Sequence, residues 1–181
     1  MVRTPPQPNL VMIGFMGSGK TTVGRLVARV LGREFVDIDE LVVRGAGLPV
    51  AEIFRREGEE SFRRREASAI DDAVRYPARV IAVRGGAVLS ADNRTVLKQA
   101  GYLVYLRASP ETLGGRLGDG SDRPLLNVAD RTGRIRDLLV ARGPIYETAG
   151  DLTVDTDQAT PEQAADTVVR WYRERNGRGE R

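Results

Sequence analysis

The stretch Gly14-Phe15-Met16-Gly17-Ser18-Gly19-Lys20-Thr21 decides the fold of this chain. It follows the apolar run Leu10-Val11-Met12-Ile13 and leads into residues 22–31, whose apolar side chains recur at the spacing of one helical face. A strand, a glycine-rich loop with the spacing G-x-x-x-x-G-K-T and a helix, in this order, are typical of a phosphate-binding loop.

Each residue type in this loop has a physical reason to be there. Glycines let the backbone turn so that successive N–H groups point inward and form a nest for an anion. The N-terminus of the following helix adds unpaired N–H donors and a partial positive charge. Lys20 brings a full positive charge to the terminal phosphates, and the hydroxyl of Thr21 can bind Mg²⁺. We therefore expect nucleotide contacts from Gly14, Gly17, Ser18, Gly19, Lys20, Thr21 and Thr22.

The composition narrows the possible functions. The chain has 181 residues, of which 41% are apolar, in the range of a single globular domain. It carries 28 basic and 25 acidic residues, and most arginines are interleaved with acidic residues. Without a clustered basic stripe, no nucleic-acid partner is predicted. No stretch approaches the roughly 20 apolar residues of a membrane span, so no membrane partner is predicted either.

Three further features of the composition bear on location and chemistry. Residues 1–9 are rich in proline and lack an apolar signal region, so we expect a disordered lead and a cytoplasmic protein. The absence of cysteine leaves the redox compartment open. The absence of histidine means that any general base must be a carboxylate, a lysine or a water molecule.

Apolar strand patterns alternate with helical patterns along the rest of the chain. Short segments rich in β-forming residues lie at 34–39, 79–83, 102–106 and 151–155, in addition to the first one at 10–13. This alternation predicts an α/β fold with three layers, α/β/α, and a five-stranded parallel sheet. We expect one domain over residues 10–175, followed by a polar tail over 176–181, and a monomer, since no exposed apolar face stands out.

Two segments are expected to stand apart from the sheet. Residues 40–75 read as helices with a break at Gly58, which suggests a helical flap that binds a second substrate. Residues 118–128 include the polar run from Gly118 to Pro124. That run is either a mobile active-site lid or an ordinary surface loop, and its position alone favours neither.

Polar residues collect where the predicted strands end, which is where ligands bind in sheets of this kind. Asp37 and Asp39 end the second strand segment. One of the two could hold the hydration shell of Mg²⁺, and the other could accept a hydrogen bond from an alcohol. Asp37 could instead be a carboxylate that stabilises a turn or a helix end.

Six motifs in order resemble the shikimate kinase family, within the small phosphate-loop kinases related to nucleoside monophosphate kinases. The resemblance covers nearly the whole chain, from residue 10 to about residue 175. The motifs are Gly14 to Thr21; Asp37-Ile38-Asp39; Ile53-Phe54 with Gly58-Glu59 and Phe62-Arg63-Arg64; Gly85-Gly86-Ala87-Val88; Arg123-Pro124-Leu125-Leu126; and Arg142 with Pro144 and Tyr146.

This resemblance implies a transfer of the γ-phosphoryl group of Mg²⁺·ATP to the 3-hydroxyl of shikimate. It implies that Lys20 and Arg123 stabilise the phosphates, and that Thr21 binds Mg²⁺ with Asp37 behind it. The matched shikimate contacts are Asp39, Arg63, Gly85, Gly86 and Arg142. Arg116 matches a residue near the adenine, and residues 155–161 match the adenine loop. Asp39 or Asp37 is the expected proton acceptor.

The chain departs from the resemblance at one position, because shikimate kinases usually carry three glycines where this chain has Arg84-Gly85-Gly86. The Arg84 side chain could point away and pair with a nearby carboxylate, which would leave the activity intact. It could instead point into the pocket and narrow it, or serve a differently shaped acid. The first alternative is favoured because Asp39, Arg63 and Arg142 are retained.

Two other functions remain open at this stage. One is a kinase of the same fold that acts on another hydroxylated acid or polyol, such as a gluconate-like or cyclitol substrate. The other is a regulator that binds nucleotide without catalysis. The presence of Lys20, Asp37 and Arg123 argues against the regulator.

Overall fold

A computed structural model describes residues 7–118 and 130–177. A five-stranded sheet forms its centre, in the order β2-β3-β1-β4-β5, and every strand pair in it is parallel. The predicted sheet is therefore confirmed. Its strands are β1 (Asn9–Ile13), β2 (Phe35–Asp37), β3 (Val80–Ala82), β4 (Gly101–Arg107) and β5 (Leu152–Asp155).

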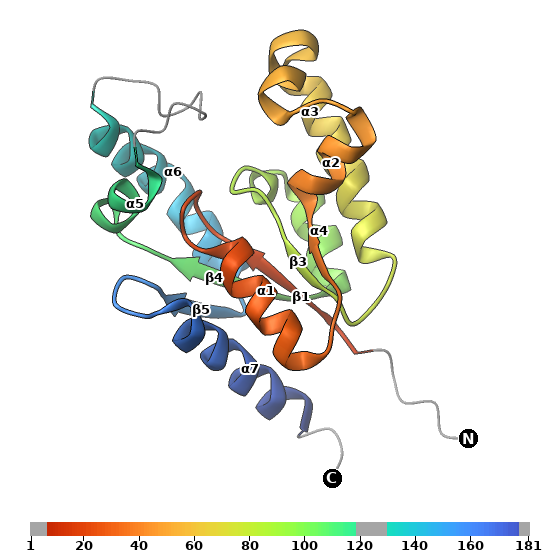
Figure 1. Cartoon of the computed structure of the whole chain (residues 1–181), viewed down its shortest axis with the longest axis vertical. Coiled ribbons are helices and arrows are strands. Elements are labelled where there is room, and N and C mark those ends of the chain that lie inside the picture. Colours follow the sequence, from red (N-terminus) through yellow and green to blue (C-terminus); the bar gives the residue numbers. More distant parts are fainter. Residues whose placement is uncertain (1–6, 119–129, 178–181) are drawn as a thin grey trace.

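Helices cover both faces of the sheet, which confirms the three-layer α/β/α prediction (Figure 1). One face packs against α1 and α7, and the other packs against α3, α4 and α6. The helical elements are α1 (Lys20–Leu31), α2 (Ile38–Ala46), α3 (Val50–Val74), the 3₁₀ turn η1 (Ala87–Leu89), α4 (Ala91–Ala100), α5 (Pro110–Leu117), α6 (Arg131–Ala149) and α7 (Pro161–Gly177).

The central strand β1 shows why the sheet is buried on both sides. Its side chains alternate between the faces, as in any strand. Leu10 and Met12 pack in the cluster of α1 and α7, while Val11 and Ile13 pack in the cluster of α3, α4 and α6. All four are fully buried, so the unbroken apolar run in the sequence is the signature of a strand covered twice.

The helix-capping signals in the sequence are confirmed. Ser90 and Ser109 accept hydrogen bonds from backbone N–H groups in the first turns of α4 and α5. Thr160 and Gln163 form a reciprocal capping box at the start of α7. Gly32 ends α1 in the left-handed conformation, as a glycine at this position commonly does.

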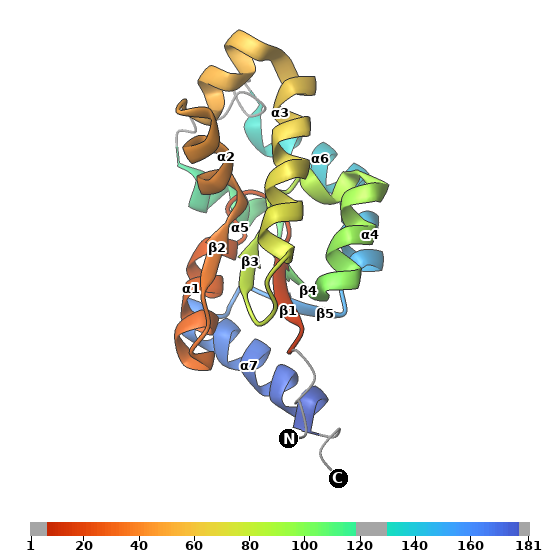
Figure 2. The ribbon, with the colours of Figure 1, turned by 90° about the vertical axis from the view of Figure 1, so that its right-hand side faces the viewer.

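The helical region after β2 has the expected break. In α3 the backbone of Gly58 leaves the helical conformation, with φ 82° and ψ 173°. Helices α2 and α3 pack against each other and extend past the sheet at its carboxyl edge (Figure 2). Of the predicted lid, only Gly118 belongs to the described residues.

The second strand is shorter than the sequence predicted. We expected Asp39 at the end of a strand, but β2 ends at Asp37 and Asp39 lies in the first turn of α2. The cause is the side chain of Asp37, which caps α2. Its Oδ1 accepts a hydrogen bond from the N–H of Asp39 over 3.0 Å, so the helix starts as soon as the strand stops.

Helix α6 runs through an interior proline. Gly143 and Pro144 favour a helix end near residue 141, but α6 continues through Pro144 to Ala149. Proline lacks the N–H for the helical hydrogen bond, which normally disfavours an interior position. The burial of Tyr146 and Ala149 against the sheet favours continuation of the helix.

The predicted lead and tail are also shorter than expected. Asn9 belongs to β1 and is 1% exposed, and its Oδ1 accepts a hydrogen bond from the N–H of Arg79 over 2.8 Å. Residues 176 and 177 belong to α7. Among residues 7–118 and 130–177, no helix combines the length and apolar character needed to cross a membrane.

The contact between β1 and β4 yields a stability prediction at Gly101. A Cβ atom at this position would lie 2.1 Å from the carbonyl oxygen of Asn9 on the paired strand. The backbone oxygen cannot move without breaking the sheet, so Gly101→Ala is expected to lower the free energy of unfolding by about 3 kcal/mol. Equilibrium unfolding in urea measures the change.

Gly45→Ala is the matched control for this substitution. Gly45 is exposed within α2, and a Cβ atom there would have no neighbour within 4 Å. We expect the control to stabilise the protein by about 0.5–1 kcal/mol, because alanine favours the helix over glycine. Equal stabilities of the Gly101→Ala variant and the parent would contradict the packing argument.

Candidate active site

The phosphate loop joins β1 to α1 and needs glycine for a conformational reason. Gly14, Gly17 and Gly19 have φ values of 138°, 80° and 97°, which other residues rarely adopt. The ammonium group of Lys20 folds back onto this loop and donates to the carbonyl oxygens of Gly14 (2.9 Å) and Phe15 (2.6 Å). The loop thus holds the lysine beside its own backbone.

The two residues predicted to bind the metal meet beside the loop. The hydroxyl of Thr21 donates to Oδ2 of Asp37 over 2.9 Å. A hydroxyl and a carboxylate are hard oxygen ligands of the kind Mg²⁺ prefers, and this ion usually takes few protein ligands together with water and phosphate oxygens. The donor set therefore fits Mg²⁺. Among residues 7–118 and 130–177, no group of three or more acidic, histidine or cysteine residues is arranged so that it could hold a metal ion.

One pocket of about 580 Å³ connects the phosphate loop to the residues expected to hold the acceptor. Most of the predicted site residues line it: Gly17, Gly19, Lys20, Thr21, Thr22, Asp37, Asp39, Arg63, Gly85, Gly86, Arg116 and Arg142. Gly14 and Ser18 belong to the loop but do not line the pocket, and Arg123 lies outside the described residues.

Arg63 is fixed in the acceptor end of the pocket by contacts on two sides. Its Nη1 donates to Oε2 of Glu66 over 2.7 Å, and Glu66 is fully buried. A second carboxylate, that of Glu59, contacts Arg63 over 3.1 Å from an exposed position. A Cβ atom on Gly86 would lie 2.9 Å from the guanidinium, so a larger residue at position 86 would shift the guanidinium of Arg63 from this position.

Tyr146 holds the neighbouring glycine in place. Its hydroxyl donates to the carbonyl oxygen of Gly85 over 2.8 Å. Burial raises the pKa of Tyr146 to about 12, so this hydroxyl stays protonated and remains a donor. A Cβ atom on Gly85 would lie 3.0 Å from both this hydroxyl and the carbonyl oxygen of Gly14. Gly85 is therefore confined between α6 and the phosphate loop.

Asp39 lines the pocket and forms an ion pair with an arginine. Its Oδ2 accepts from Nη1 of Arg84 over 3.1 Å. Its Oδ1 is buried and has no hydrogen-bond partner among the described atoms. Burial raises the pKa of Asp39, and the nearby Arg84 guanidinium opposes that rise.

The expectation that Arg84 points away from the pocket is wrong. Arg84 does pair with a carboxylate, but that carboxylate is Asp39, and the arginine lines the same pocket as Arg63 and Arg142. The early end of β2 explains the difference. It places Asp39 on the first turn of α2, within reach of Arg84, which lies two residues after the end of β3.

Arg116 and the predicted adenine stretch lie together. The guanidinium of Arg116 donates to the hydroxyl of Thr156 over 3.0 Å, and also to the carbonyl oxygen of Thr156. The carboxylate of Asp157 accepts from the N–H of Ser109 over 2.8 Å, which ties the stretch to the start of α5. Hydrogen bonds thus join Arg116, which lines the pocket at the phosphate loop, to the stretch predicted to lie near the adenine.

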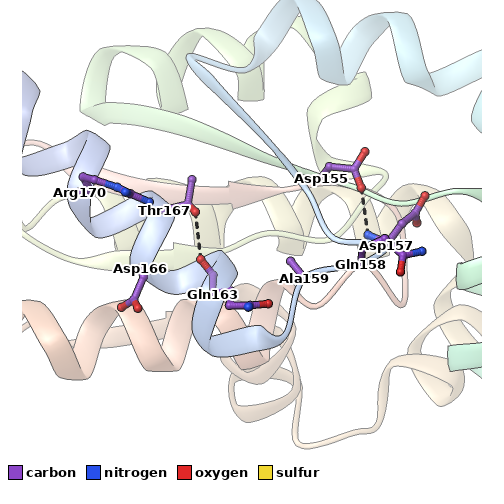
Figure 3. Close-up of a pocket in the computed structure, with 8 residues that line it drawn as sticks. All are labelled: Asp155, Asp157, Gln158, Ala159, Gln163, Asp166, Thr167 and Arg170. Atoms are coloured by element: carbon purple, nitrogen blue, oxygen red, sulfur yellow. Dashed lines mark hydrogen bonds between the residues drawn. The ribbon is translucent and has the colours of Figure 1, made fainter.

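A second pocket, of about 800 Å³, lies on the outer side of this region, along α7 (Figure 3). Its lining combines Asp155 at the end of β5 and Asp157 of the following loop with Gln163, Asp166 and Arg170 of α7. It contains no residue of the phosphate loop. Its carboxylates make it unsuited to phosphate, so the pocket at the phosphate loop is the candidate active site.

Comparison with known proteins identifies a family whose members resemble most of this chain. The family model described as shikimate kinase matches residues 16–173. The chain belongs to the shikimate kinase family. A shikimate kinase of Symbiobacterium thermophilum is 47% identical over 173 residues, which cover 94% of this chain and 99% of the relative. Another, of Caldanaerobacter subterraneus, is 45% identical over 170 residues, which cover 94% and 99%.

A solved structure extends the likeness to three dimensions. The shikimate kinase from Acinetobacter baumannii, in complex with shikimate, superposes with a TM-score of 0.89 at 38% identity. The match covers 93% of this chain and 94% of that one. The family assignment makes this chain an ATP-dependent small-molecule kinase, which confirms the enzyme class expected from the sequence.

Two residues of the site were not predicted. Glu66 lies three residues after Arg63 on α3, and this spacing places both on one helix face. Tyr146 was quoted as part of a motif without a role. For Glu66 the sequence signal is the i,i+3 spacing from Arg63, and for Tyr146 it is the nearby Arg142. Neither pattern alone indicates that the residue is buried.

Proposed function

We propose that this protein is a shikimate kinase that transfers the γ-phosphoryl group of ATP to the 3-hydroxyl of shikimate. One observation carries the proposal. A single pocket is lined at one end by the phosphate loop and at the other by a carboxylate, two arginines and two glycines, namely Asp39, Arg63, Arg142, Gly85 and Gly86. The planar guanidinium groups match a carboxylate, and Asp39 matches a hydroxyl.

In this mechanism the hydroxyl oxygen of the acceptor forms a bond to the γ-phosphorus as the bond to the β–γ bridging oxygen breaks. The proton of the hydroxyl passes to the carboxylate of Asp39, which lines the pocket. Lys20 offsets negative charge on the transferred group. Such transfer needs mainly position and charge compensation, so a weak base is sufficient.

Mg²⁺ would be held by Thr21 and Asp37, and it would offset the charge of the phosphate oxygens. Arg123, outside the described residues, is proposed to add a second positive charge beside Lys20, and Arg116 is proposed to lie near the adenine. We expect the enzyme to act as a cytoplasmic monomer. The large exposed apolar side chains among the described residues, Val30, Tyr76 and Val140, sit on separate segments rather than in one patch.

A coupled assay of ADP release with shikimate as acceptor tests the proposal. Turnover well above the rate of ATP hydrolysis without acceptor is expected. A panel with gluconate-like acids and cyclitols distinguishes a kinase for another hydroxylated acceptor. Nucleotide binding without turnover of any acceptor would instead identify a regulator.

Arg63→Ala is expected to raise KM for shikimate by about 30-fold while kcat changes little. A hydrogen bond between charged groups contributes about 1.5–3 kcal/mol, and in our proposal Arg63 holds the substrate carboxylate in both the ground state and the transition state. Initial-rate kinetics with varied shikimate measure both constants. A fall in kcat with KM unchanged would contradict the proposed role.

Arg63→Ala also leaves Glu66 buried without its cation, so stability must be separated from binding. The double variant Arg63→Ala/Glu66→Gln removes both charges and should recover the Tm but not the KM. Arg64→Ala is the matched control, because Arg64 is 67% exposed and pairs with Glu60 on the helix surface. The control should change neither constant by more than about twofold.

A further inference from the structure

Arg84 occupies the acceptor end of the pocket. It lies two residues after the end of β3, and its backbone does not adopt a positive φ, so the arginine fits without strain. Its guanidinium carbon lies 5.3 Å from the centre of the Phe62 ring and 6.0 Å from that of Phe54. Together with the ion pair to Asp39, these rings hold the side chain in place while 33% of it stays exposed.

The ion pair fixes one carboxylate oxygen of Asp39. Oδ2 accepts from Arg84, whereas Oδ1 is buried without a partner among the described residues. Arg84 therefore orients Asp39 as well as neutralising it.

The charges of the acceptor end give Arg84 a further consequence. Asp39 pairs there with Arg84, and the buried Glu66 pairs with Arg63. Glu59 also contacts Arg63, but its side chain is 68% exposed, so solvent screens its charge. Arg142 makes no ion pair with any described carboxylate. Without Glu59, the acceptor end carries one net positive charge with Arg84 present and would carry none with a neutral residue at that position.

We propose that Arg84 is a specificity-determining residue, which holds Asp39 by Oδ2 and supplies the charge that makes this subsite select a hydroxylated acid over an uncharged molecule of the same shape. The identity of the acid rests on the proposed function. The selectivity itself follows from the charge balance, because a single charge inside a partly buried pocket strongly favours an opposite charge.

The test compares shikimate with its methyl ester, which keeps the ring hydroxyls and loses the charge. The ratio of kcat/KM for the acid to that for the ester is measured in the parent and in three variants. Arg84→Met replaces the arginine by a neutral side chain of similar volume, and Arg84→Gly removes the side chain. Both are expected to lower this ratio about tenfold. Arg84→Lys keeps the charge and should stay within about threefold of the parent.

Two controls separate selectivity from damage to the fold. Arg64→Met removes an exposed arginine of the neighbouring helix and should leave the ratio unchanged. ADP affinity, measured by calorimetry, should be the same in every variant, because Arg84 lies at the acceptor end. Equilibrium binding of the acid and the ester, measured by the same method, gives the comparison even if the ester is bound without turnover.

The outcomes are distinct. An unchanged ratio in Arg84→Met and Arg84→Gly, or an equal loss for acid and ester, would overturn the assignment of Arg84. A larger ratio in these variants would overturn it too, since Arg84 would then oppose the acid. Failure of the parent to phosphorylate shikimate would instead refute the proposed function, and this result appears before any variant is compared.

Discussion

Lys20→Met is expected to lower kcat by about a thousandfold while the fold and the affinity for shikimate remain. Charge accumulates on the transferred phosphoryl group and on the leaving oxygen, and Lys20 is the described cation held beside the phosphate loop. Removing one preorganised donor from such a site costs about two to three orders of magnitude. Methionine keeps most of the unbranched side chain and removes the charge together with the N–H donors.

Single-turnover kinetics with saturating ATP and shikimate measure this effect free of product release. Lys98→Met is the matched control, since Lys98 lies on α4 and donates to the carbonyl oxygen of Thr148 over 3.4 Å, away from the pocket. It should retain the parental kcat. A decrease below tenfold in Lys20→Met would show that other cations carry the charge compensation.

Asp39→Asn is expected to lower kcat by about a thousandfold through loss of the proton acceptor. General base catalysis contributes about two to four orders of magnitude, and asparagine keeps the shape of the side chain. Asp72→Asn is the matched control. Its carboxylate is 62% exposed on α3 and pairs with Arg75, so its removal should leave kcat unchanged.

The pH dependence supplies a second test of Asp39. Burial raises the pKa of this carboxyl group above 3.8, and the base must be ionised to accept a proton. Activity should therefore be present above the raised pKa and disappear as the pH falls through it. In Asp39→Asn the small residual rate should lack this acid limb. An identical acid limb in parent and variant would assign the titration to another group.

Much of the fold was predictable because its signals are local. The alternation of short apolar strands with capped helices needs only neighbouring residues, and Ser90, Ser109, Thr160 and Gly32 mark helix ends by their own chemistry. The phosphate loop could also be predicted from the sequence, because positive φ values within the loop itself require its glycines.

The errors arise where distant parts of the chain meet. Pro144 was placed outside a helix by a local rule, whereas α6 persists because Tyr146 and Ala149 are buried against the sheet. Glu66 reads as a surface residue in a chain with 29% charged residues, and only the packing of α3 shows that it is fully buried. The direction of Arg84 depended on where α2 places Asp39.

Asp37 has two roles, at the proposed metal site and at the start of α2, and together they limit the residues that can occupy position 37. Its Oδ2 contacts Thr21 at the proposed metal site, and its Oδ1 caps the helix that carries Asp39. Serine or asparagine would cap the helix but would bring no negative charge to the cation. Glutamate would bring the charge but is not among the residues that cap helix starts well. Aspartate alone meets both requirements, so in a library of variants at position 37 it is the residue that selection for activity should recover.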